Sequence, residues 1–70
     1  MLILARNYDE KAVFIPYKNL SAIETKKEGE TYTVLFFTKN GLIYRNQGFE
    51  THEDAVNSVK NMGIDWVENK

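Results

Sequence analysis

The segment Val34–Arg45 places an Asn-Gly pair between two runs of β-forming residues. Asn-Gly is the strongest short-range signal for a hairpin, because both central residues of a type I′ turn need a positive φ angle. With Asn40 and Gly41 as a two-residue loop, the cross-strand partners follow by counting outward from the turn. They are Lys39 with Leu42, Thr38 with Ile43, Phe37 with Tyr44, Phe36 with Arg45, Leu35 with Asn46 and Val34 with Gln47.

This register sorts the side chains of the hairpin onto two faces, since successive residues of a strand point to opposite sides. The first face carries Tyr32, Val34, Phe36 and Ile43, with Phe49 beyond them. The second face carries Leu35, Phe37, Leu42 and Tyr44. Both faces are apolar, so both need to be covered. What covers the second face becomes the central question about function.

The size of the chain limits what can provide that cover. Seventy residues make a single domain, 1–70. The core of such a small domain rarely supplies more than roughly 3–5 kcal/mol of stability. The chain has no cysteine, which excludes disulfides and thiol catalysis and is typical of a reducing compartment. Oligomerisation is the remaining means of stabilisation, so we expect a homodimer.

Turn-forming residues divide the rest of the chain into short strands. Asn7 and Asp9 separate two apolar runs, which predicts a first hairpin. Pro16 has no backbone N–H, so it either ends the second strand or places that strand at a sheet edge. The strands are predicted at about 2–6, 11–16, 21–27, 31–38 and 42–47.

The turn between the third and fourth strands is predicted at Glu28-Gly29. A two-residue loop there places Ile23 opposite Val34. The alternative is that Gly29 lies in a bulge, which would change this pairing.

The periodicity changes to that of a helix after residue 50. Thr51 and Asp54 have the spacing of a helix N-cap and its reciprocal partner. Gly63 suits the left-handed position that ends a helix, with Ile64 placed to contact Val59. We therefore predict a helix over about 52–62. Its apolar residues at helical spacing are Ala55, Val56, Val59 and Met62.

An apolar tail, 64–67, follows the helix and contains the only tryptophan, Trp66. A polar tail at this position would fray. This apolar tail is expected to dock on the sheet or on a partner.

The predicted fold is α+β, a five-stranded antiparallel β-meander with one C-terminal helix on one face. We assign the helix to the face of Val34, Phe36 and Ile43. The second face then has two possible covers. Either the first hairpin curls over it and gives a small barrel, or another molecule covers it.

The sequence contains no recognisable catalytic or metal-binding pattern. His52 is expected to be an exposed polar residue in the first helical turn, and no second histidine completes a metal site. Neither Ser21 nor Ser58 lies in a nucleophile elbow. The glycines are dispersed among turns, so no phosphate-binding loop is formed. We expect neither an enzyme nor a cofactor.

Charge and hydropathy restrict the partners and the location. The formal net charge of −1 gives no overall attraction to nucleic acid or to an anionic membrane. The apolar run at the start of the chain is too short for a signal peptide, and no run reaches membrane-spanning length. We expect a cytoplasmic protein. Its high content of Lys, Asn and Ile is similar to that of small proteins from low-GC bacteria and their phages or plasmids.

Three functions remain as hypotheses. The first is a self-associating module that binds or inhibits another protein, because aromatic residues anchor such interfaces. The second is a protein that binds single-stranded nucleic acid through aromatic and basic residues. The third is a small-ligand sponge or sensor whose dimer closes a pocket over the second face. The candidate interface is Leu35, Phe37, Leu42, Tyr44 and Trp66, and the candidate nucleic-acid contacts are Tyr17, Lys18, Lys26, Lys39 and Arg45.

Overall fold

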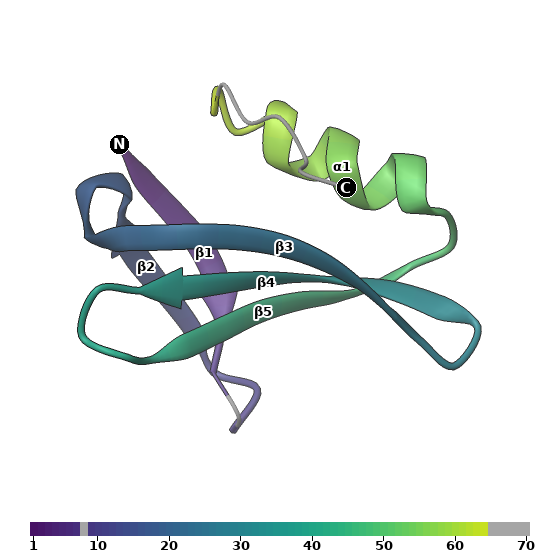
Figure 1. Ribbon diagram of the computed structural model, residues 1–70, viewed down its shortest axis with the longest axis horizontal. Coiled ribbons are helices and arrows are strands. Elements are labelled where there is room, and N and C mark those ends of the chain that lie inside the picture. The colour runs from purple at the N-terminus through teal and green to yellow at the C-terminus, as the bar shows by residue number, and fades with distance from the viewer. Residues whose placement is uncertain (8, 65–70) are drawn as a thin grey trace.

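The computed structural model describes residues 1–7 and 9–64. Within them, five strands form one antiparallel sheet that is not closed into a barrel, and one helix packs on the sheet (Figure 1). This confirms the predicted α+β fold. The elements are β1 (Leu2–Arg6), β2 (Ala12–Pro16), the 3-10 helix η1 (Tyr17–Asn19), β3 (Leu20–Glu28), β4 (Thr31–Thr38), β5 (Ile43–Phe49) and α1 (His52–Lys60).

The order of strands in the sheet is β2-β1-β5-β4-β3. Strands β3, β4 and β5 form a meander, and the hairpin of β1 and β2 joins it through a pairing of β1 with β5. Strands β2 and β3 follow each other in sequence, yet they form the two opposite edges of the sheet. Pro16 is the last residue of β2, and β2 lies at an edge of the sheet, so both predicted consequences of the proline are confirmed.

The turn between β4 and β5 differs from the predicted one. Gly41 has a φ angle of 85°, but Asn40 is not among the residues with positive φ. The Gly41 N–H donates to the Thr38 carbonyl, and the Thr38 N–H donates to the Leu42 carbonyl. This is a three-residue loop, in which a type I turn is followed by one left-handed glycine. The predicted two-residue type I′ turn is therefore wrong.

Thr38 gives a physical reason for the wider loop. Its side-chain hydroxyl accepts from the Leu42 N–H at 3.0 Å and also bonds the side chain of Asn40. These bonds stabilise a pairing of Thr38 with Leu42, whereas the predicted turn paired Thr38 with Ile43. The register of the hairpin consequently differs by one residue from the prediction.

A one-residue change of register moves side chains to the other face of a strand. Phe36 lies opposite Tyr44, and Phe37 lies opposite Ile43. Tyr44 therefore shares the face of Phe36, and Ile43 shares the face of Phe37. The predicted faces of these two β5 residues are wrong, whereas the predicted faces of the two phenylalanines are confirmed.

The turn between β3 and β4 also differs from the predicted one. The loop between β3 and β4 is Gly29-Glu30, with Gly29 at a φ angle of 63°. It lies one residue later than predicted, so Ile23 faces Phe36 instead of Val34. The predicted pair is wrong by two residues, which leaves Ile23 on the same face of the sheet.

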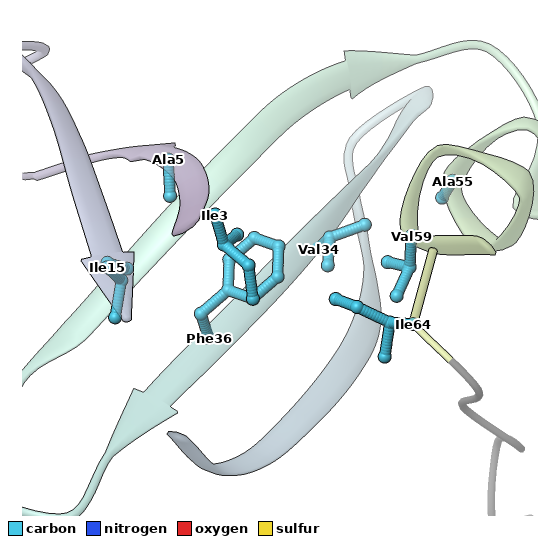
Figure 2. Close-up of a cluster of buried hydrophobic side chains, with 8 residues drawn as sticks. All are labelled: Ile3, Ala5, Ile15, Val34, Phe36, Ala55, Val59 and Ile64. Carbon is cyan, nitrogen blue, oxygen red and sulfur yellow. The ribbon is translucent and has the colours of Figure 1, made fainter. Parts of the chain in front are cut away.

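Within the described residues a buried cluster forms the core, and it joins both halves of the sheet to the helix (Figure 2). Figure 2 shows Ile3 against Phe36, so the first hairpin covers the same face as α1. The hypothesis that this hairpin covers Leu35 and Phe37 is wrong. We call the covered side the inner face. Its core residues are Ile3, Ala5, Ile15, Val34 and Phe36, packed with Ala55, Val59 and Ile64.

Both ends of the helix match the sequence signals. The Thr51 side chain accepts a hydrogen bond from the Asp54 N–H at 3.0 Å, as an N-cap does. Gly63 has a φ angle of 83°, and Ile64 is buried in the same cluster as Val59. The helical residues end at Lys60, two residues before the predicted end. Trp66 and the rest of the predicted tail lie outside the described residues.

Candidate interaction surface on the outer sheet face

The side of the sheet opposite the core is the outer face. Residues paired across an antiparallel ladder share a face, and successive residues of a strand point to opposite faces. Because Ile3 and Phe36 point into the core, the next pairs along the strands, Leu4–Phe14 and Phe37–Ile43, lie on the outer face. Two groups of apolar side chains lie on this face. The first hairpin contributes Leu2, Leu4 and Phe14, and strands β4 and β5 contribute Leu35, Phe37 and Ile43.

The most exposed apolar group of the outer face is Leu2, Leu4 and Phe14, which we call the hairpin patch. The exposed fractions of these side chains are 62%, 48% and 65%. Leu4 and Phe14 lie directly opposite each other, and Leu2 lies two residues before Leu4 on the same side. Adjacent exposed apolar side chains of this size mark interaction sites more often than scattered ones do.

The second apolar group, in β4 and β5, is better covered by its own neighbours. Leu35 and Phe37 are half-buried in β4, which lies between β5 and β3, and Ile43 is exposed. Ala22 of β3 lies beside Phe37. This group therefore has less exposed apolar area than the hairpin patch.

A polar group separates the two apolar groups. Arg6 and Arg45 lie opposite each other across β1 and β5, where like charges repel. Glu10 lies close to both arginines. Its carboxylate is 3.5 Å from the Arg45 guanidinium and accepts from the Gln47 amide, while its backbone carbonyl accepts from Arg6. The turn between β1 and β2 is thereby held against β5.

The structure brings together only part of the predicted interface. Leu35 and Phe37 lie on the outer face, while Tyr44 packs against the core from the inner face. Leu42 is about half exposed in the turn, opposite Thr38. Trp66 lies outside the described residues.

The hairpin patch was missed, although the sequence carries a signal for it. Leu2 and Leu4 alternate with Ile3 and Ala5, so a strand at this position has to expose one apolar set or bury both. Tertiary packing decides which set is exposed. The helix and the first hairpin cover the same face of the sheet, so Ile3 and Ala5 are buried and Leu2 and Leu4 are exposed.

The predicted nucleic-acid contacts divide into two groups. Tyr17, Lys18 and Lys39 line one open depression at the start of β3. The Lys39 N–H donates to the Asn19 carbonyl at 2.8 Å, which holds the β4–β5 turn beside η1. Lys26 does not line this depression, and Arg45 is engaged by Glu10.

His52 is a structural contact in this fold. It is half-buried, with Nε2 3.2 Å from the Thr25 hydroxyl and its ring edge-on to Tyr32. The expectation that it is exposed is wrong. Among residues 1–7 and 9–64, no cluster of three His, Cys, Asp or Glu side chains could hold a metal ion.

A further depression, lined by Val13, Leu42 and Tyr44 with their neighbours, has no charged side chain in its lining. It therefore gives no basis for choosing a class of small ligand.

Comparison with known proteins adds no further constraint. No family model matches the chain, and neither a curated protein nor a solved structure is significantly similar to it. No helix within the described part of the chain is long and apolar enough to cross a membrane.

Proposed function

We propose that this protein is a non-catalytic module that binds other polypeptides, in the first place a second copy of itself, through the outer face of its sheet. The observation that carries this proposal is the hairpin patch. Leu4 and Phe14 face each other on the outer side of an edge hairpin, and about half or more of each side chain is exposed.

The size of the patch supports a binding role. Complete burial of a Leu or Phe side chain is worth about 1.5–3 kcal/mol, and the three side chains of the patch are roughly half exposed. Covering them therefore recovers about 2–5 kcal/mol before the costs of association. That gain is similar to the stability that a small core provides, so a partner on this surface also stabilises the fold.

The distribution of charge favours a polypeptide over single-stranded nucleic acid as the partner. Binding to phosphates depends on unbalanced Lys and Arg side chains. Among the residues predicted to contact nucleic acid, Lys18 and Lys39 line one depression together with the exposed ring of Tyr17. Of the two guanidinium groups between the outer apolar groups, that of Arg45 is paired with a carboxylate.

The proposal is tested by light scattering from low micromolar to millimolar protein concentration. We expect the mass to rise from the monomer value of 8.1 kDa towards twice that value. Phe14→Lys should keep the protein monomeric without changing its far-UV circular dichroism. Leu42→Lys is the matched control, because Leu42 is similarly exposed but lies outside the hairpin patch.

Two results contradict the proposal. A wild-type protein that stays monomeric over the whole range contradicts self-association. An equal loss of dimer in Leu42→Lys and Phe14→Lys shows that the hairpin patch is not the contact surface.

A further inference from the structure

We infer that the second copy docks edge to edge, so that strand β2 pairs antiparallel with β2 of the other copy and Phe14 lies on the two-fold axis. This inference rests on the proposed self-association and specifies its geometry. The product is one continuous sheet that runs through both copies.

The edge of β2 is available for such pairing. β2 is the last strand in the sheet, and its neighbour within the described residues is β1 alone. Two backbone bonds flank the ladder between β1 and β2: the Asn7 N–H donates to the Lys11 carbonyl, and the Tyr17 N–H donates to the Met1 carbonyl. Since bonded pairs alternate along an antiparallel ladder, these two bonds determine which residues of β2 direct their backbone groups towards β1. Ala12, Phe14 and Pro16 consequently direct their backbone groups away from β1.

Pro16 and Phe14 together select the register. Pro16 has no N–H, so it can offer the new edge only its carbonyl. With Phe14 on the axis, Pro16 lies opposite Ala12 of the other copy and accepts from the Ala12 N–H. The two Phe14 residues donate to and accept from each other. A register centred on Pro16 sets two residues without N–H against each other, and one centred on Ala12 places Phe14 beyond the end of the facing strand. A register centred on Val13 or on Ile15 pairs Phe14 with Ala12 or with Pro16, so the two Phe14 residues no longer lie directly opposite each other.

The side chains agree with this register. The two Phe14 rings become direct cross-strand neighbours, an arrangement that stabilises sheets. Each ring already lies beside Leu4 of its own copy, so the two hairpin patches meet side by side, and the contact covers mainly the two Phe14 rings.

The two edges of the sheet also differ in their protection against pairing. Charged side chains on an edge strand oppose association with another strand. The edge strand β3 carries Glu24, Lys26 and Lys27, whereas β2 has no charged residue between Ala12 and Pro16. A symmetric contact needs one self-complementary surface, and β2 is the edge that provides it.

Cysteine crosslinking tests the register, since the chain has no cysteine of its own. Ala12→Cys and Pro16→Cys are prepared separately, and their folding is checked by far-UV circular dichroism. An equal mixture is then oxidised at a concentration where the wild type is dimeric. We expect a covalent dimer from the mixture and little from either variant alone, because only the mixed dimer places the two thiols opposite each other within the Cα separation that a disulfide spans.

Amide hydrogen exchange of the unmodified protein provides a second measurement that needs no substitution. We expect the Ala12 and Phe14 amides to exchange at least tenfold more slowly at dimeric than at monomeric concentration. The Val13 and Ile15 amides, which face β1, should change less.

The outcomes separate the inference from the proposed function. A dimer that forms without the mixed crosslink and without protection of Ala12 and Phe14 overturns the β2 pairing but leaves self-association standing. A protein that stays monomeric overturns both, even if it captures an extended peptide at the same edge. A crosslink in each single variant alone indicates another register and also overturns the inference.

Discussion

The two faces of the sheet can be tested by comparing one phenylalanine from each. Phe36 is completely buried on the inner face, whereas Phe14 is 65% exposed on the outer face. Truncating a buried Phe to Ala costs about 3–5 kcal/mol, because apolar contacts are lost and a cavity remains. A domain of this size has roughly 3–5 kcal/mol from its core. We therefore expect Phe36→Ala to leave little or no net stability at 25 °C.

Phe14→Ala provides the matched comparison with the same chemical change. Only about a third of this side chain is covered in the monomer, so the loss is about 1 kcal/mol. For a domain of 60–100 residues, that loss lowers the melting temperature by about 4–8 °C. Urea denaturation followed by far-UV circular dichroism measures both variants. A low micromolar concentration keeps self-association out of the comparison.

The result that refutes this reasoning is a similar loss from both substitutions. It would mean that Phe14 is part of the monomer core, and that the apolar side chains of the outer face are covered within one chain. A loss below about 1 kcal/mol from Phe36→Ala would contradict the packing of the inner face in the same way.

Three further substitutions test local features of the fold by urea denaturation. Thr51→Ala removes the hydroxyl that accepts from the Asp54 N–H and should cost about 1 kcal/mol, whereas Thr51→Ser should retain most of the stability; equal losses would contradict the cap. Gly48→Ala should cost roughly 1–2 kcal/mol, because the φ angle there is 90° and no atom within 4 Å would obstruct the new methyl group; a neutral result would mean that the backbone relaxes. Glu10→Gln weakens a contact of 3.5 Å with Arg45 in which the Glu10 side chain is 53% exposed, so the loss should stay below about 1 kcal/mol and shrink with added salt; a larger loss, insensitive to salt, would contradict this assignment.

The strands and the helix could be predicted because local residues determine them. Thr51 accepts the N-terminal bond of the helix, and Gly63 takes the left-handed conformation after it. Pro16 lies in an edge strand, where its missing N–H leaves no ladder bond unmade. Each of these residues acts within a few positions of itself. Their signals are therefore readable in the sequence.

The cross-strand pairs could be predicted less well, because alternative turns differ little in their sequence requirements. Asn40-Gly41 suits a two-residue type I′ turn, but Gly41 alone also suits a three-residue loop. The Thr38 hydroxyl supports the wider loop through the Leu42 N–H. The Gly48 conformation accompanies a second irregularity, between the pairs Val34–Asn46 and Tyr32–Phe49. Neither effect is visible in hydrophobic periodicity.

The change of register alters where a partner would bind. In the predicted register Tyr44 would have joined Phe37 on the outer face and given it an aromatic pair. In the structure Tyr44 packs against the core, and Ile43 takes its place. The outer side of β4 and β5 is then less aromatic than expected, and the most exposed ring of the outer face is Phe14. Because Phe14 lies in an edge strand with outward backbone groups, the same residue can offer a partner both an apolar contact and a strand to pair with.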